Sequence, residues 1–213
     1  MQQKLKRAKE LLPAIIITVL SMIQALALEL YWSKMQSAEF LWQGGWDAVV
    51  GWAQLGVMLL GIIQIWLTYV SIILRFSWFP SMQDTVTPFA IGLLEFGMID
   101  MMGLESLGAW FLLLATIFGV STWAVHMIHR QARKDPENHY FFHNIQAAGW
   151  RDFTGSYIVI GILVILGTVL WLSGNAGILA TAGLLFAAAA IVRQLYLCHK
   201  YWMHSLLLEE DGE

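Results

Sequence analysis

The stretch Trp46–Leu74, WDAVVGWAQLGVMLLGIIQIWLTYVSIIL, decides the fold class of this chain. It holds one charged residue, Asp47, in 29 positions, whereas a helix needs about 20 apolar residues to cross the hydrocarbon core of a bilayer. The run is longer than a crossing requires, so we expect it to tilt or to begin along the interface.

The rest of the chain has the same character. Of its 213 residues, 58% are hydrophobic and 13% are charged, against about 45–50% and about 25% in soluble domains. This composition excludes a disordered tail, a nucleic-acid binder and an ordinary soluble enzyme, and it predicts an all-α polytopic membrane protein with six transmembrane helices. The predicted spans cover about residues 13–32, 46–74, 87–104, 108–129, 155–173 and 177–197.

The first apolar run follows a basic segment, MQQKLKRAKELLP. A cleaved signal peptide begins in the same way, but this run is long for one and no clear cleavage site follows it. We therefore predict a retained first helix with Pro13 in its first turn, where a missing N–H costs nothing.

Basic residues are sorted to one side of the predicted membrane. With six spans, 11 of the 12 Lys and Arg residues fall on the side of the termini, and Lys34 alone falls on the other. The positive-inside rule then places both termini, a loop at 130–152 and a tail at 199–213 in the cytoplasm. The expected location is the inner membrane of a bacterium.

A short amphipathic helix is expected before the fifth span. After Pro136, aromatic and aliphatic residues recur near helical spacing at Tyr140, Phe141, Ile145 and Trp150. This pattern is typical of a helix that lies in the membrane interface.

Glu95 is the most informative polar residue, because it falls in the middle of the third span. A charged carboxylate at mid-bilayer costs roughly 2.5–3.5 kcal/mol on insertion scales, and no Lys or Arg lies at comparable depth to neutralise it. Glu95 is then either protonated and hydrogen-bonded to Gln64 or Gln24, or exposed to a hydrated cavity that binds a cation. The structural alternative is a neutral carboxyl that only joins two helices.

Two further acids, Asp100 and Glu105, follow Glu95 towards the outer side. At about 100° per residue, Asp100 and Glu95 lie about 140° apart around a helix, so their side chains face different neighbouring helices. In an oligomer one of them could repeat as a ring around a central axis. An acidic outer vestibule would concentrate cations. The alternative is that basic residues are excluded from the outer side by topology, which by itself leaves acidic residues in excess there.

All six histidines fall at or near the inner side. The spacings of His126 with His129 and of His139 with His143 place two imidazoles on one helix face. We consider pH sensing near the ordinary histidine range, a metal or haem site, and plain interfacial residues. No third ligand is patterned nearby, so no metal and no cofactor is predicted.

Other chemistry finds no support in the sequence. A single cysteine, Cys198, forbids an internal disulfide. No voltage-sensor arginine ladder, potassium-filter motif or phosphate loop occurs, and no nucleophile and base can be assembled, so we do not expect an enzyme.

The leading hypothesis is a small oligomeric membrane protein that moves a cation or a proton along Glu95, Asp100, Glu105, Gln64 and Gln24. The alternative is a non-transporting scaffold or sensor subunit that binds a soluble partner through its cytoplasmic loop and tail. The expected partners are therefore the lipid bilayer, further copies of the chain and, in the alternative, a soluble cytoplasmic protein.

Overall fold

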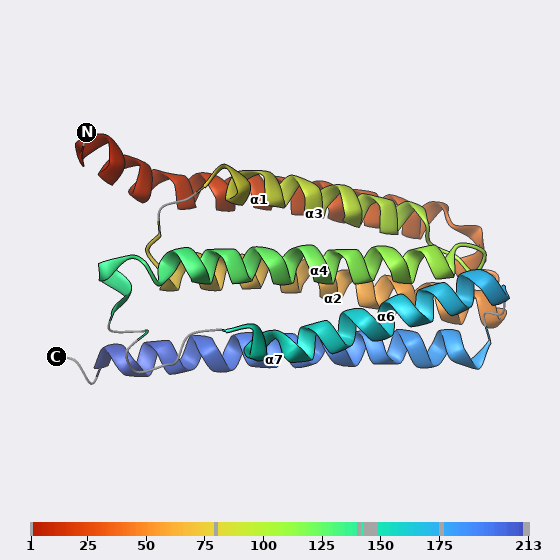
Figure 1. The fold of residues 1–213 in the computed structure, drawn as a ribbon. Helices are drawn as coiled ribbons and strands as arrows, with labels where there is room; N and C mark the ends of the chain where they lie inside the picture. Colours follow the sequence, from red (N-terminus) through yellow and green to blue (C-terminus); the bar gives the residue numbers. More distant parts are fainter. Residues whose placement is uncertain (1, 79–80, 140–141, 143–148, 175–176, 211–213) are drawn as a thin grey trace.

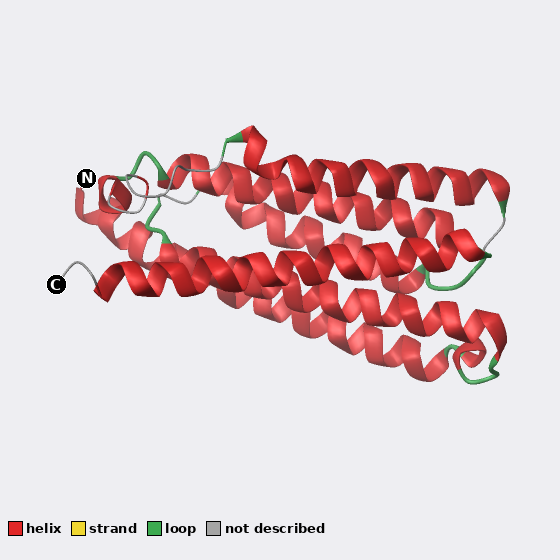
Figure 2. Ribbon diagram, turned by 90° about the horizontal axis from the view of Figure 1, so that it is seen from below, coloured by secondary structure: helices red, strands yellow, loops and turns green. Residues whose placement is uncertain are grey.

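The computed structural model describes residues 2–210 except 79–80, 140–141, 143–148 and 175–176. Within these residues the helices are joined by short loops, and no strand occurs (Figure 2). Its long helices are α1 (Gln2–Ser37), α2 (Gly45–Arg75), α3 (Met82–Asp100), α4 (Leu107–Ala132), α6 (Thr154–Ser173) and α7 (Ile178–Glu210). Three short 3-10 helices are η1 (Glu39–Leu41), η2 (Pro136–Asn138) and η3 (Trp150–Phe153).

The six long helices run side by side in alternating directions and form an elongated bundle (Figure 1). α1 begins and α7 ends at the same end of this bundle. We call it the basic end, because it carries Lys9, Arg75 at the last residue of α2 and Arg133 directly after α4. The opposite end, the acidic end, holds the connections around Glu39 and Glu105.

Helices that are neighbours in space are often distant in sequence. The most extensive contacts join α4 with α6, α2 with α7, and α1 with α3. Glycine makes the contact between α4 and α6 possible. A Cβ on Gly108 would lie 2.6 Å from the main-chain nitrogen of Trp171 and 2.9 Å from the carbonyl oxygen of Gly167. The backbones of α4 and α6 therefore touch at a pair of small residues, as in many membrane helix pairs.

The outer surface of the bundle is strongly apolar. Large hydrophobic side chains face outward, with Leu93 exposed by 71%, Leu172 by 80% and Ile178 by 88%. Five of the described helical segments are also long and apolar enough to cross a membrane: Pro13–Ser37, Gly45–Arg75, Leu107–Ala132, Thr154–Ser173 and Ile178–Lys200. An apolar exterior on such helices is what lipid contact requires.

α3 is not among these five segments. It has 19 residues and includes Asp84, Glu95 and Asp100, so its apolar character is weaker. It nevertheless lies along α1 over much of its length (Figure 1). Its bounds differ from the predicted 87–104, because Ser81 and Asp84 form a capping box that starts the helix at Met82.

Both terminal helices are longer than predicted. α1 begins at Gln2, so the prediction that Pro13 lies in the first turn is wrong: Pro13 is inside the helix. Residues 2–12 are mostly good helix formers, which favours a further helical stretch before the proline. α7 continues to Glu210 and takes in most of the predicted tail at 199–213.

The predicted interfacial helix falls mainly on residues outside the described ones. Tyr140, Phe141 and Ile145, on which the prediction rested, lie outside the described residues, and Trp150 is the first residue of η3.

Candidate functional site

Glu95 lies inside the bundle, between α3 and α1. Its side chain is 5% exposed, and one carboxyl oxygen, Oε2, accepts a hydrogen bond of 2.9 Å from Nε2 of Gln24. Gln24 is itself 4% exposed. Of the two amides predicted as partners, Gln24 is the one that the structure brings to Glu95.

A close helix approach brings these two side chains together. One turn before Glu95, Gly92 faces Ile23 so tightly that a Cβ at position 92 would collide with Cγ2 of Ile23. Ile91 and Met98 flank Glu95 on the same face of α3 and are also buried. An apolar, closely packed interface therefore surrounds the Gln24–Glu95 pair.

Each member of the pair has one oxygen with no hydrogen-bond partner among the described residues. These atoms are Oε1 of Gln24 and Oε1 of Glu95. Buried polar atoms are rarely left without a partner. A proton on Glu95 would convert its unpartnered oxygen from an acceptor into a donor and would remove the cost of a buried charge.

Asp100 and Glu105 lie apart from this pair, at the acidic end. Both side chains are exposed. Glu105 borders a cavity of about 360 Å³ with Trp171 and Gly174. At Asp100 the main-chain carbonyl, at the last residue of α3, accepts a hydrogen bond of 2.9 Å from Nζ of Lys34. The ammonium group of Lys34 thus sits at a helix C-terminus, where a positive charge is favourable.

Gln64 lies elsewhere, on the wall of a cavity of about 350 Å³ between α2, α4, α6 and α7. We call it the four-helix cavity. The Gln64 amide donates a hydrogen bond of 2.8 Å to the Thr68 hydroxyl, one turn along α2. Of the five residues in the predicted ion pathway, then, only Gln24 and Glu95 are joined by a hydrogen bond within the described structure.

The histidines are spread over separate environments. His129 lies on the wall of the four-helix cavity, where its Nδ1 is 2.7 Å from the Val125 carbonyl and its ring meets Phe76 edge-on at 5.2 Å. His126 meets Phe153 edge-on at 5.6 Å. His139 is exposed at the end of η2, and His143 lies outside the described residues. No group of three His, Cys, Asp or Glu side chains that could hold a metal ion occurs in the described part.

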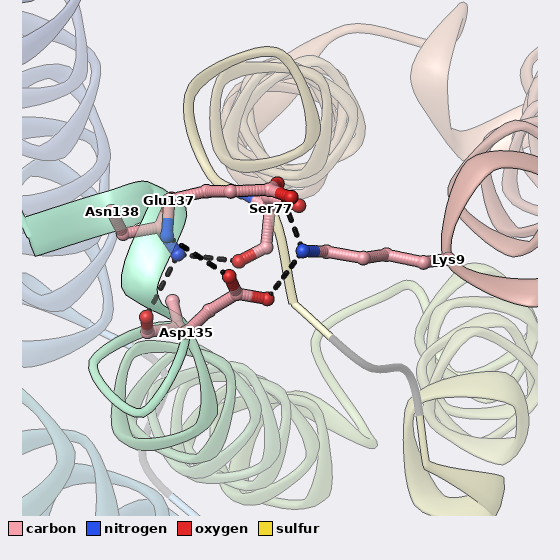
Figure 3. A network of polar contacts seen from close by, with 6 residues as sticks. Lys9, Ser77, Asp135, Glu137 and Asn138 are labelled. Atoms are coloured by element: carbon pink, nitrogen blue, oxygen red, sulfur yellow. Dashed lines mark hydrogen bonds and ion pairs between the residues drawn. The ribbon is translucent and has the colours of Figure 1, made fainter. Parts of the chain in front are cut away.

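A polar network at the basic end was not predicted (Figure 3). Nζ of Lys9 lies 2.7 Å from Asp135 and 2.8 Å from Glu137, which ties α1 to the connection after α4. Beside them, Asn138 is 6% exposed and bonds to Ser77, which follows α2. The network joins three segments that are far apart in sequence.

Electrostatics strengthen this network. Burial alone would raise the pKa of Asp135, but hydrogen bonds from Lys9 and from the Glu137 N–H hold it below its usual range. Hydrogen bonds from Lys9 and Ser77 likewise lower the pKa of Glu137. Burial would lower the pKa of Lys9, but its two carboxylate partners raise it.

Two other buried polar residues were also missed. Asp84 is buried, and its Oδ2 accepts hydrogen bonds from the N–H and the hydroxyl of Ser81. Gln54 is 0% exposed, and its Oε1 accepts a hydrogen bond of 3.0 Å from the Gly103 N–H. The Ser-x-x-Asp spacing could have predicted the contact of Asp84 with Ser81. The contact of Gln54 with Gly103 joins residues 49 apart in the sequence, so no local pattern predicts it.

The apolar exterior and the five long apolar helices are those of a helical membrane protein. The chain matches no family model, no curated protein and no solved structure.

Proposed function

We propose that this protein moves protons across a membrane, with Glu95 as the proton-binding site. The observation that carries the proposal is the buried Gln24–Glu95 pair, in which one oxygen of each side chain has no partner among the described residues. An ionisable group inside a membrane span is costly to keep and marks proton and ion pathways.

The surroundings of Glu95 favour a proton over a metal cation. Calcium takes six to eight oxygen ligands, and magnesium takes an octahedral set. The hydrogen bond at Glu95 comes from a single amide, and its neighbours Ile23, Ile91 and Met98 offer apolar side chains. A carboxyl can bind one proton in such a site without further ligands.

The proposal includes six membrane spans, with α3 as the third, and the basic end in the cytoplasm of a bacterial cell. It is supported by the alternating directions of the six helices (Figure 1) and by the basic residues Arg75, Arg133 and Lys134 at the end where α1 begins and α7 ends. Exposed Asp100 and Glu105 would supply a negative approach on the outer side. Assembly into an oligomer belongs to the same proposal, and the apolar exterior offers surface for it.

The test is a flux assay in liposomes that contain the purified full chain and a pH-sensitive dye. A potassium gradient with valinomycin drives proton entry, which acidifies the lumen. We expect Glu95→Gln to abolish the flux, because the amide keeps the shape of the side chain but cannot release a proton. Glu29→Gln, at an exposed acid of α1, is the matched control and should leave the flux unchanged. Equal flux in wild type and Glu95→Gln, or none in either, contradicts the proposal.

A second candidate is the scaffold or sensor subunit. The observation that favours it is the exposure of Arg130, Arg133 and Lys134 at the basic end, next to the predicted cytoplasmic loop. Such a cationic surface suits an acidic soluble partner. If it is correct, neutralising these three residues should abolish binding of that partner, and Glu95→Gln should leave the binding intact.

A further inference from the structure

The four-helix cavity occupies the half of the bundle that faces the basic end. Along α2 its wall runs from Gly61 through Gln64 and Thr68 to Arg75, which is roughly 20 Å at 1.5 Å per residue. Its volume of about 350 Å³ falls near the lower limit of small-molecule pockets, roughly 300–1,000 Å³. The cavity is thus long and of modest volume, which suits one slender ligand.

The wall changes in character along this length. The inner part is formed largely by aliphatic and aromatic side chains such as Leu114, Ile117 and Phe118, with hydroxyls and amides between them. Two guanidinium groups also line the cavity: Arg75, at the last residue of α2, and Arg193, which lies beside the start of α6. No Asp or Glu is among the described residues that line the cavity. A ligand that matches this wall is apolar along its body and negative at its head.

The position of Arg193 strengthens the requirement for a negative head. Its Nη1 lies 3.1 Å from where a Cβ on Gly155 would be, so the guanidinium rests against the first turn of α6. The 3-10 helix η3 runs directly into α6, and the N-terminus of this helical segment carries a partial positive charge. A cation beside this N-terminus is unfavourable by itself, and an anion between the two would bind to both.

Unpartnered polar atoms belong to the same wall. Oε1 of Gln64, the hydroxyl of Tyr69 and the hydroxyl of Ser121 are buried without a hydrogen-bond partner among the described residues, and all three residues line the cavity. Tyr69 is only 4% exposed. Buried polar atoms usually have a hydrogen-bond partner, and a turn of these side chains towards the cavity would bring them to a ligand.

We propose that the four-helix cavity binds a single-chain amphiphile with an anionic head group, the chain lying along α2 and α4 and the carboxylate or phosphate lying between Arg193 and the first turn of α6. This inference goes beyond proton movement and does not depend on it. Glu95 lies between α1 and α3, outside the cavity wall.

The chain contains a natural reporter of occupancy. Cys198 is its only cysteine, and it lines the cavity, with Sγ 3.2 Å from the Ser71 hydroxyl. A ligand in the cavity should shield this thiol from N-ethylmaleimide. A ligand present at about ten times its Kd leaves roughly a tenth of the protein free, so the reaction should slow about tenfold.

The probes are decanoate and decyl phosphate, with decanol as the neutral counterpart and inorganic phosphate as the head group alone. We expect both anionic amphiphiles to protect Cys198, and decanol and inorganic phosphate to have little effect. Arg193→Gln should raise the Kd of both anionic amphiphiles roughly tenfold or more, as expected for the loss of a charge-assisted hydrogen bond. The Kd is read from the concentration at which each ligand protects Cys198. Arg130→Gln is the matched control, because this exposed arginine of α4 does not line the cavity.

Equal protection by decanol and decanoate, equal protection of wild type and Arg193→Gln, or protection by phosphate alone would each overturn the proposal. If the thiol reacts too slowly to follow, a diazirine derivative of decanoate replaces the assay. Its cross-links should map to α2, α4 or α7 in the cavity wall and be competed by decanoate, and labelling confined to the outer surface contradicts the site. Glu95→Gln should keep full protection, so a failure of this proposal is distinguishable from a failure of the proton proposal.

Discussion

The side-chain amide of Asn138 bonds to both main-chain polar groups of Ser77. Its Oδ1 accepts a hydrogen bond of 3.0 Å from the Ser77 N–H, and its Nδ2 donates to the Ser77 carbonyl. The same Nδ2 also donates to the carbonyl of Ala132 at 2.7 Å. One buried side chain thus holds the segment after α2 against the end of α4 (Figure 3).

We predict that Asn138→Ala destabilises the fold. The substitution leaves the N–H and the carbonyl of Ser77 without their Asn138 partner, while the Ala132 carbonyl keeps the Asp135 N–H. Each unsatisfied buried group costs about 1–3 kcal/mol. We therefore expect a loss of roughly 2 kcal/mol or more in the free energy of unfolding, measured by denaturant titration in detergent micelles. The control is His139→Ala at the exposed neighbouring position, and an equal effect of both substitutions would contradict the role of the Asn138 amide.

The contact of Lys9 with Asp135 and Glu137 should depend on pH in a defined direction. The pKa values of both carboxyls are lowered in the folded state, so their stabilisation is present above their unfolded values of about 4 and is lost as pH falls through the folded values. The pKa of Lys9 is raised, so its contribution is present below its unfolded value of about 10.4 and is lost as pH rises through the folded value.

Lys9→Met removes the charge that both carboxyls share. The stability difference between wild type and Lys9→Met should be constant near neutral pH and should shrink below about pH 4, where the unfolded carboxyls bind protons. Thermal unfolding over a series of pH values measures it. A difference that stays constant down to pH 2 would show that the ion pairs contribute nothing.

Gly108→Ala should push α4 away from α6. The added methyl group would lie 2.6–2.9 Å from main-chain atoms of Trp171 and Gly167, which cannot move aside as a side chain can. Overpacking of this kind costs about 1–3 kcal/mol, and denaturant titration should detect it. Gly119→Ala, also in α4, is the matched control, since its methyl group would meet nothing within 4 Å; it should be neutral or stabilising by up to about 1 kcal/mol.

The fit between Gly92 and Ile23 can be tested by a double-mutant cycle. Gly92→Ala alone should destabilise the α1–α3 contact and disturb the nearby Gln24–Glu95 hydrogen bond. Ile23→Ala removes the colliding Cγ2, so the double variant should lose less stability than the sum of the single variants, with a coupling of roughly 0.5–3 kcal/mol. Ile23→Val retains a Cγ2 atom and should not rescue Gly92→Ala. Additive effects would place the two residues out of contact.

Much of the helical architecture could be predicted from the sequence, because long apolar runs in this chain have one plausible structure. Pro13 misled the prediction of the first helix, because a proline that favours a helix start can also be tolerated inside a longer helix. The start of α3 could have been found from the Ser81–Asp84 spacing, which is a recognised capping signal.

The site was less predictable, for a physical reason. Glu95 stands out by its chemistry alone, but the choice between Gln24 and Gln64 as its partner depends on which helices pack together. The four-helix cavity and the contact of Asn138 with Ser77, 61 residues away, also follow from helix order. Helix periodicity indicates which face of each helix is buried, but it does not indicate which other helix packs against that face.

The pairing of α2 with α7 has a consequence for biosynthesis. α2 is synthesised before α3, α4 and α6, but α7, the helix that makes the most extensive contact with α2, follows all of them in the chain. Until then, the Gln64, Thr68 and Ser71 side of α2 must be covered by lipid or by a chaperone of the insertion machinery. Completion of the bundle is thus a late event, and a chain that stops before Ile178 should remain a substrate for membrane quality-control proteases.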